Sequence, residues 1–360
     1  MDSEKWIINW LYGLLLIPLI AGVNYIVDPY NMNGSFSLEL KRKSNTNYTY
    51  RFKTNIIENG NFDTLMLGTS RIGVMNPTFV NKELNVSTFN FSAPASTTFI
   101  QHKLFLYALH FNNIKNVIYG IDFMAFNEAK SIEKDFKSFD MIKQNIYKYK
   151  HISNYDLYFN LDTTFSTVAM IYNNIGNKSK VSEQYNKNNG MREYLNNKDA
   201  LAHGSYDSKS NIEESLLLYF NSKNGIYKNY KFSKKYLYDF KKTVDYCKKH
   251  QIKLWVYIPP MFSEHLEKLK EKNYFNHFLE FEKELIEVTD YVDFNGYNSI
   301  TLNQNNYWDS SHLREELTPL VMKKVLHPFK KSKVDDFGKY INKNNILEHF
   351  RYLEDLESNK

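Results

Sequence analysis

Residues 62–71 read FDTLMLGTSR, and this stretch decides how the chain is expected to fold. Its apolar first part is typical of a short strand buried on both faces of a parallel sheet. Gly68 ends the strand and Ser70 follows at once, so the serine hydroxyl can point out of the sheet edge. Asn76-Pro77 then predicts a helix start, with asparagine as the cap and proline at the first helical position.

Further apolar runs repeat the pattern along the chain, separated by amphipathic stretches. We expect strands at 87–91, 116–123, 252–258 and 291–294. Strands that alternate with helices indicate an α/β fold, here with a five-stranded parallel sheet covered by helices on both faces. Active sites in such sheets lie at the carboxyl ends of the strands. The turn after the first strand and the loop after the fifth are therefore expected to meet.

The loop after the fifth predicted strand reads WDSSHL, residues 308–313. A serine nucleophile needs a base with an accessible ring nitrogen, and an acceptor that fixes the tautomer of that base. Asp309 and His312, three positions apart, can supply both. Neither Gly-x-Ser nor Asp-x-x-His is specific alone, but their places in one α/β pattern favour serine catalysis by Ser70. A rival pair, His203 and Ser205, follows no strand and is expected to be a solvated loop.

Over about residues 60–330 the sequence resembles the SGNH (GDSL-like) hydrolase superfamily. More narrowly, it resembles the membrane-anchored branch that contains alginate O-acetylation proteins and the D-alanyl-lipoteichoic-acid transfer protein. The resemblance implies an SGNH-like (flavodoxin-like) three-layer sandwich. The segments that carry it are Leu67-Gly68-Thr69-Ser70-Arg71, Phe89-Asn90-Phe91-Ser92, Tyr119-Gly120-Ile121-Asp122, Ile258-Pro259-Pro260 and Asp309-Ser310-Ser311-His312.

Carried over by position, the resemblance makes Ser70 the nucleophile, His312 the base and Asp309 its orienting partner. The backbone N–H of Ser70 would form part of the oxyanion hole. Two positions depart from the family pattern. The aspartate that usually precedes the nucleophile is Thr69, and the usual Gly-x-Asn ends in Asp122.

The second departure leaves the third oxyanion donor open, because an ionised aspartate cannot donate a hydrogen bond. Asn90 is a candidate substitute for the missing asparagine. Asp122 could instead hold a loop or the substrate. Arg71 could bind an anionic acceptor or lie on a helix surface.

The N-terminus is uncharged from Trp6 to Val27, and about 20 apolar residues span a bilayer as a helix. Tryptophan at one end and tyrosine at the other suit the two membrane interfaces. The cleavage-site pattern of a signal peptide is poor here, so we expect a retained signal-anchor. Basic residues do not settle the orientation, since Lys41-Arg42-Lys43 lie beyond the far end. The resemblance implies a catalytic domain on the extracytoplasmic side.

The whole chain then divides into four parts. With 42% hydrophobic and 16% aromatic residues, its 360 residues can build a large core. The parts are a cytoplasmic stub and transmembrane anchor (1–30), a connector (31–60), the SGNH-like catalytic domain (61–330) with a helical insertion at about 127–230 that loops out near 180–212, and a C-terminal helical tail (331–360).

Composition excludes several other classes of function. The net charge of +6 is spread along the chain rather than gathered on a stripe or arm, which argues against nucleic-acid binding. Cys247 is the single cysteine and is expected to fill a buried apolar position on a helix. No histidine has ligand partners at metal-binding spacing, so we predict neither a metal nor another cofactor.

The leading functional hypothesis is acyl transfer or ester hydrolysis through a Ser70 acyl-enzyme. The resemblance implies an envelope glycopolymer as substrate and a multispan membrane O-acyltransferase as a partner that delivers the acyl group. One alternative is a catalytically silent SGNH-like module that binds polysaccharide or scaffolds an export complex. A secreted lipase is disfavoured by the uncleaved anchor and by the lack of a long apolar lid.

Overall fold

A computed structural model describes residues 3–30, 40, 46–130, 155–175, 183–331 and 334–354. The α-helices are α1 (Ser3–Val27), α2 (Thr46–Asn59), α3 (Ser70–Gly73), α4 (Pro77–Leu84), α5 (Thr98–Phe111), α8 (Tyr155–Tyr158), α9 (Leu161–Asn174), α10 (Leu195–Ala202), α11 (Ser208–Phe220), α12 (Lys234–Lys249), α13 (Ser263–Glu271), α14 (Phe275–Ile286), α15 (Thr318–Leu326) and α16 (Ile346–Glu354). The strands are β1 (Thr64–Leu67), β2 (Thr88–Asn90), β3 (Asn116–Gly120), β4 (Glu183–Tyr185), β5 (Arg192–Tyr194), β6 (Lys253–Ile258), β7 (Tyr291–Asp293) and β8 (Lys339–Ile341). Short 3-10 helices lie at Phe123–Phe126, Gln304–Asn306 and Glu315–Leu317.

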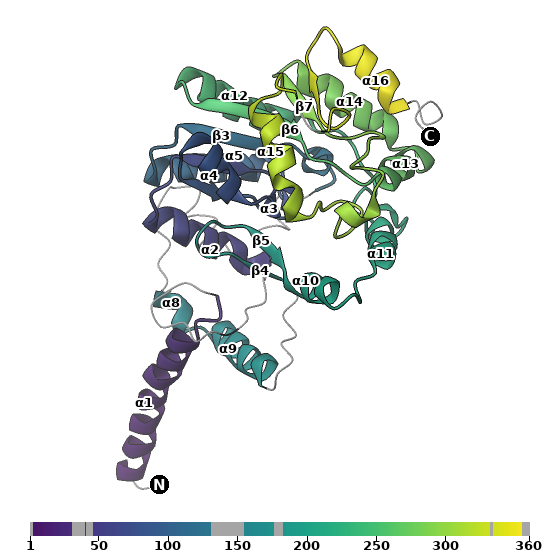
Figure 1. Cartoon of the computed structure of the whole chain (residues 1–360). Helices are drawn as coiled ribbons and strands as arrows, with labels where there is room; N and C mark the ends of the chain where they lie inside the picture. The colour runs from purple at the N-terminus through teal and green to yellow at the C-terminus, as the bar shows by residue number, and fades with distance from the viewer. Residues whose placement is uncertain are drawn as a thin grey trace.

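The main sheet has six strands in the order β2-β1-β3-β6-β7-β8, and its neighbours are parallel except at β8. The α/β prediction is therefore confirmed. The prediction of five strands, all parallel, is not confirmed, because β8 adds an antiparallel edge strand beside β7 (Figure 1). This strand lies in the C-terminal tail (331–360), which was expected to be helical. A strand as short as Lys339–Ile341 carries too little alternation of polar and apolar residues to be recognised.

Helices cover both faces of the sheet, because successive side chains of a strand point to opposite sides. Leu65 and Leu67 of β1 belong to one hydrophobic cluster with residues of α5, α12 and α14. Met66, between them, belongs to a second cluster with residues of α4 and α15. Cys247 of α12 is buried in the first cluster, as expected, and burial raises the pKa of its thiol to about 12.

The strand order reverses between β1 and β3. From β1 the chain moves to one edge through β2, and from β3 it moves toward the other edge through β6 and β7. The carboxyl ends of neighbouring strands at such a reversal frame a crevice where ligands bind. Ser70, at the start of α3, follows directly on β1 at this place.

Part of the predicted insertion joins the hydrophobic cluster that contains Met66 instead of looping out. From Met191 to Phe220 the chain forms β5, α10 and α11, and α11 buries an apolar face. The hydroxyl of Tyr206 donates to the carbonyl of Trp308, in the loop after β7. The polar composition was misleading because many of these contacts are made by hydroxyl groups. Residues 131–154 and 176–182 of the insertion lie outside the described part of the chain.

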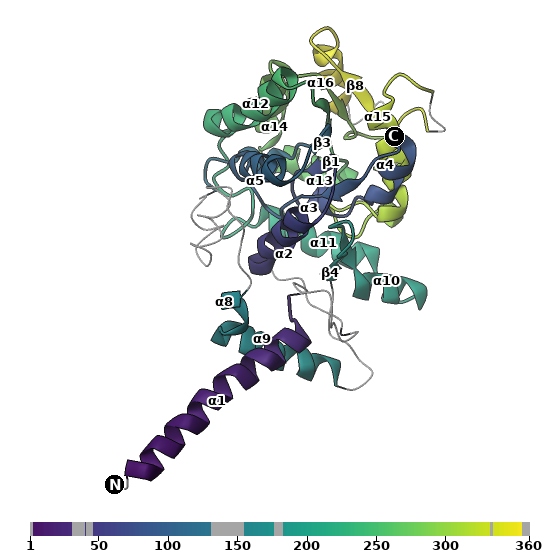
Figure 2. The same ribbon diagram turned by 90° about the vertical axis from the view of Figure 1, so that its left-hand side faces the viewer.

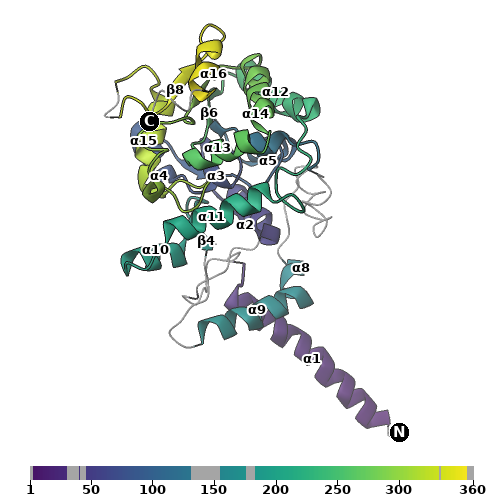
Figure 3. The same cartoon turned by 90° about the vertical axis from the view of Figure 1, so that its right-hand side faces the viewer.

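The helix α1 is long and apolar enough to cross a membrane, judged by length and composition. Within its segment Lys5–Val27, a window of 18 residues has a mean hydropathy of 1.9, and 6% of that window is buried. In all three views α1 projects away from the α/β domain, and α8 and α9 lie beside the end of α1 that is nearer the domain (Figure 1, Figure 2 and Figure 3).

Candidate active site

Ser70 is held by a turn that only glycine permits at its start. Gly68 has φ +142°, and a Cβ at this position would lie 2.4 Å from the carbonyl oxygen of Gly120 on β3. Thr69 caps the short helix α3, and its side-chain oxygen accepts from the N–H of Arg71. Ser70 is the first residue of that helix and is largely buried, with 9% of its surface exposed. The predicted strand and turn are therefore present; the helix expected at Asn76-Pro77 is α4, and α3 is an additional short helix before it.

His312 lies on a tight loop whose ends are joined by backbone hydrogen bonds. Tyr307 and Leu313 form an isolated antiparallel bridge, and the N–H of Trp308 donates to the carbonyl of His312 at 2.8 Å. Inside the loop, one carboxylate oxygen of Asp309 accepts the backbone N–H groups of Ser311 at 2.7 Å and of His312 at 3.0 Å. The aspartate thus fixes both the loop and the ring that it faces.

The three residues predicted from the sequence are brought together as a hydrogen-bonded row. Nε2 of His312 lies 2.9 Å from Oγ of Ser70, and Nδ1 lies 2.8 Å from Oδ2 of Asp309. A carboxylate can only accept, so it favours the tautomer with the proton on Nδ1. Nε2 then carries the lone pair and accepts from the Ser70 hydroxyl. This is the geometry that a general base needs to remove a proton from a serine.

Asp309 is ionised in this row. Burial by itself would raise its pKa, but the adjacent His312 ring and the hydrogen bonds from His312 and Ser311 outweigh burial. Together they hold the pKa of the carboxyl well below its usual 3.8. A carboxylate so placed stabilises the imidazolium that forms when His312 takes up a proton.

Asp122 is a structural residue that contacts the turn around Ser70. It is 1% exposed, and its Oδ2 accepts from Oγ1 of Thr69 at 2.8 Å. Nε of Arg71 lies 3.3 Å from the same oxygen, and its Oδ1 accepts the N–H of Met124. Of the two alternatives for Asp122, the loop-holding one agrees with these contacts. A substrate cannot reach a carboxylate buried to this degree.

Arg71 is also buried, at 2% exposed, so the alternative that placed it on a helix surface is wrong. Burial would lower its pKa, but Asp122 and the phenols of Tyr227 and Tyr219 raise it above the ordinary value, so the guanidinium stays charged. Its Cζ lies 5.9 Å from the centre of the Tyr219 ring. The guanidinium is therefore enclosed by aromatic rings behind the site and is not offered to an anionic acceptor.

Asn90 does not provide the missing oxyanion donor. Its amide donates to the backbone carbonyls of Ile72 at 2.7 Å and Met75 at 3.0 Å, and the side chain is fully buried. Its oxygen accepts from the N–H of Ser92. The asparagine ties the carboxyl end of β2 to α3 and to the residues just after it, which leaves no amide hydrogen for a ligand. The prediction failed because a sequence does not tell which groups an amide bonds.

The backbone N–H of Ser70 remains as the candidate oxyanion donor. It is the first N–H of α3, a position without an intrahelical acceptor. Within the described parts of the chain it donates to no acceptor. The carbonyl oxygen of an ester bound beside Oγ of Ser70 could therefore accept a hydrogen bond from this free main-chain N–H.

A pocket of about 350 Å³ opens beside His312. Part of its lining comes from the loop that carries Asp309 and His312, and part comes from the insertion, which was expected to loop out near 180–212. The hydroxyl of Tyr219 donates to Oγ of Ser311 at 3.1 Å, and Ser311 in turn contacts both Asp309 and His312. The lining residues are Tyr194, Asn197, Asn211, Glu214, Ser215, Leu218, Tyr219, Trp308, Asp309, Ser311 and His312.

A second set of hydrogen-bonded side chains, from α11 and α13, supports the loop that carries Asp309 and His312. Oγ of Ser310 lies 2.8 Å from Oγ of Ser215 on α11 and 3.0 Å from Nδ1 of His265 on α13. The other ring nitrogen of His265 lies 3.1 Å from the hydroxyl of Tyr227. Burial, with Arg71 nearby, holds the pKa of His265 well below 6.5, so the ring is neutral. His265 is therefore a neutral, buried side chain that supports the loop through Ser310, and it is not an acid or base of the site.

The rival pair His203 and Ser205 lies on the surface, as expected. Both residues are exposed, and Nδ1 of His203 contacts only the carbonyl of Asp199 in the preceding turn of α10.

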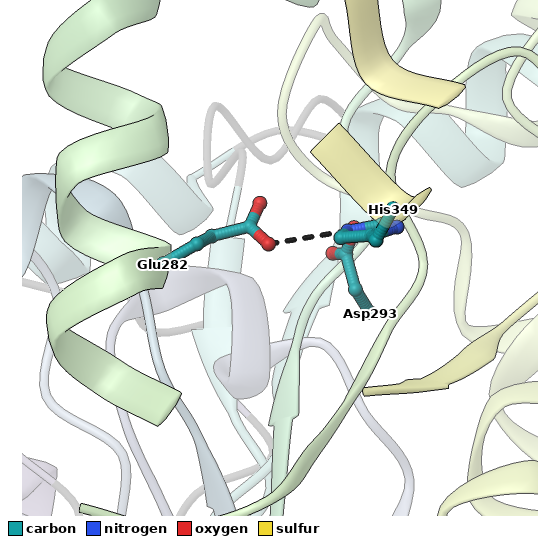
Figure 4. Close-up of side chains that lie close together, drawn as sticks. All are labelled: Glu282, Asp293 and His349. Carbon is teal, nitrogen blue, oxygen red and sulfur yellow. Dashed lines mark ion pairs between the residues drawn. The ribbon is translucent and has the colours of Figure 1, made fainter. Parts of the chain in front are cut away.

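One group of three acidic and histidine side chains among the described residues is close enough to hold a metal ion, although no metal site was predicted. Nε2 of His349 lies 3.1 Å from Glu282 and 2.9 Å from Asp293, and all three are buried (Figure 4). Burial lowers the pKa of His349, but the two carboxylates outweigh it and raise the pKa to about 10. A protonated imidazole does not bind a metal. The contacts fit an ion cluster that joins α16 to α14 and β7.

No protein-family model and no curated protein match the sequence. The geometry of the site is therefore the basis for assigning a function.

Proposed function

We propose that the chain is a membrane-anchored serine esterase or O-acyltransferase of the SGNH type, which works through an acyl-enzyme on Ser70. The observation that carries the proposal is the 2.9 Å contact between Nε2 of His312 and Oγ of Ser70, with Asp309 on the other ring nitrogen. The strand order from β2 to β7 supports the SGNH-like assignment, because it is the flavodoxin-like order 2-1-3-4-5.

In the first half of the reaction His312 takes the hydroxyl proton of Ser70 at Nε2 while Oγ attacks the carbonyl carbon of an ester. The N–H of Ser70 faces the negative charge that develops on the carbonyl oxygen. The tetrahedral intermediate then collapses, and the bond to the leaving alcohol breaks. His312 gives its proton to that alcohol, and an acyl group remains on Ser70.

The second half repeats these steps with a new nucleophile. Water or an acceptor hydroxyl gives its proton to Nε2 of His312 and attacks the acyl-enzyme, which restores Ser70. Water yields hydrolysis and a hydroxyl yields transfer. The pocket beside His312 has amide, hydroxyl and carboxyl groups among its lining residues, which suits a hydroxyl-rich acceptor better than a long acyl chain.

The family resemblance also suggests where the protein acts, on which substrate and with which partner. It suggests that α1 anchors the domain on the extracytoplasmic side and that the acceptor or donor is a glycopolymer of the cell envelope. It also suggests a multispan membrane O-acyltransferase as the partner that supplies the acyl group. Neighbouring genes would test this part directly, since a gene for such a partner beside this one would favour transfer.

Labelling with a fluorophosphonate tests the chemistry. The full-length protein in detergent should react at Ser70, as located by peptide mass spectrometry, and the Ser70→Ala variant should not. Ser92, 1% exposed and without a histidine contact, offers a matched control because Ser92→Ala should leave labelling unchanged. Equal labelling of the wild-type protein and Ser70→Ala would reject the proposal.

A catalytically silent module that binds polysaccharide or scaffolds an export complex is the second candidate. It is favoured by one observation: neither Asn90 nor Asp122 offers a donor to an oxyanion, so the N–H of Ser70 has no side-chain helper from either. The same labelling experiment separates the candidates, since a silent module would leave Ser70 unreacted while the variant and the wild-type protein remain equally folded.

A further inference from the structure

The short helix α9 has its apolar side turned outward. Five large apolar residues lie at intervals of three or four along it and just beyond its end, and so share one face of the helix. They are between 60% and 73% exposed, and nothing in the described part of the chain covers them. These residues, which we term the α9 stripe, are Leu161, Phe165, Val168, Tyr172 and Ile175.

The opposite side of α9 faces the protein and is mostly polar. Thr163 and Thr167 are buried there, with exposed fractions of 0% and 2%, next to Met170. A helix packed on a globular domain in water has the reverse arrangement, with its apolar face inward. An exposed contiguous apolar surface on a protein marks a place where something other than water is bound.

The helix is attached to the end of α1 that is nearer the α/β domain. The side-chain amide of Asn24, 1% exposed, donates to the carbonyl of Tyr158 at 2.8 Å and to Oγ1 of Thr164 at 3.0 Å. The hydroxyl of Tyr30 donates to Oγ of Ser166 at 2.7 Å. Figure 1 and Figure 3 both show α9 running crosswise to α1 at this end. A membrane crossed by α1 would therefore have its surface at the level of α9.

We propose that α9 lies in the membrane interface, with the α9 stripe inserted among the lipid acyl chains. Helices of this kind lie in the plane of the bilayer and bury their apolar face at the boundary of head groups and acyl chains. The stripe continues the exposed apolar surface of α1, which is why lipid is the occupant that fits. Asn24, and Tyr30 just beyond the end of α1, join α1 to α9 by hydrogen bonds, and the two helices together set the height and tilt of the domain above the bilayer. This inference rests on the membrane anchor of the proposed function, but not on catalysis by Ser70.

Depth-dependent fluorescence quenching tests the inference in the full-length protein. The buried Cys247 is first replaced by serine, and single cysteines that carry an environment-sensitive fluorophore are then introduced by Phe165→Cys, Leu15→Cys and Lys248→Cys. Leu15 lies in the middle of α1, and Lys248 is exposed on α12, away from α1. The proteins are reconstituted into vesicles of phosphatidylcholine and phosphatidylglycerol with and without nitroxide-labelled acyl chains.

We expect the probe at Phe165 to be quenched by the labelled acyl chains and to emit at shorter wavelength, as at Leu15, while the probe at Lys248 remains unquenched. Quenching at Leu15 but not at Phe165 would overturn the inference and leave the anchor intact; the stripe would then be a contact surface for a protein. Quenching at neither position would overturn both the inference and the anchor. None of these outcomes depends on ester turnover, so labelling of Ser70 decides the catalytic proposal separately.

Discussion

Oγ of Ser70 and Nε2 of His312 lie 2.9 Å apart, although 242 positions separate the two residues in the chain. The contact exists because β1 and β7 are parallel strands of one sheet, so the turn after β1 and the loop after β7 lie at the same edge of that sheet. Gly68 brings the serine turn close to β3, and Asp309 fixes the loop on the other side. Each half of the contact is therefore held by its own local structure.

Asp309→Asn should lower kcat for a small ester by about two to four orders of magnitude, with little change in KM. An amide can donate to Nδ1 and so favour the wrong tautomer of His312, but it occupies the same space. Steady-state kinetics with p-nitrophenyl acetate provides the measurement. A variant that keeps wild-type kcat would show that the carboxylate does not orient the base.

Asp122→Leu should destabilise the protein by about 3–5 kcal/mol, because the buried guanidinium of Arg71 would lose its counter-charge. The double variant Asp122→Leu/Arg71→Met removes both charges and should recover much of this loss. Chemical denaturation of the three proteins measures the difference. If the double variant is no more stable than the single one, the two side chains are not coupled.

The sequence predicted the parts of the site that are local. FDTLMLGTSR specifies a buried strand and a turn within ten neighbouring positions, and Asp309 and His312 lie on one short loop. It could not predict which distant groups would use the hydrogen-bonding capacity of Asn90, since an amide has several equally suitable partners.

The same limit applies to other long-range contacts. Tyr219, in the insertion, bonds Ser311 in the loop after β7. The strand β8 pairs with β7 through three residues. Neither contact has a periodic pattern of apolar residues that would indicate it. The mostly helical character of the insertion and the apolar segment Trp6–Val27 were predictable because both depend on composition over longer stretches.

Tyr219→Phe should lower kcat by about threefold to tenfold, since a lost hydrogen bond of about 1 kcal/mol loosens Ser311 and with it Asp309 and His312. The ring, which lines the pocket, is retained, so KM should change little. Leu218→Ala is the matched control, because Leu218 lines the same pocket without bonding the loop. Equal effects of the two substitutions on kcat would contradict a positioning role for the hydroxyl.

His349→Gln should lower thermal stability in a pH-dependent manner. The pKa of His349 is raised from 6.5 to about 10 in the folded protein, by Glu282 and Asp293 against the effect of burial. The stabilisation is therefore complete below pH 6.5 and is lost as the pH rises through about 10. The difference in Tm between the wild-type protein and the variant should be largest at the acid end of this window and shrink toward the alkaline end.

Metal removal is the control for this cluster. Dialysis against EDTA should leave Tm of the wild-type protein unchanged, because a protonated His349 between the two carboxylates offers no lone pair at Nε2 to a metal. A fall in Tm that added zinc reverses would contradict the ion cluster and indicate a bound metal instead.

The most direct test of the whole account is to trap the acyl-enzyme. The full-length protein is mixed with p-nitrophenyl acetate, quenched with acid after short times and digested for mass spectrometry. We predict one acetyl group on Ser70, formed with a burst of nitrophenol in the wild-type protein and slowed by orders of magnitude in His312→Ala. Nitrophenol release at the same rate in the wild-type protein and in His312→Ala, with no acetyl group on Ser70, would contradict the claim that this hydroxyl and this imidazole work as a pair.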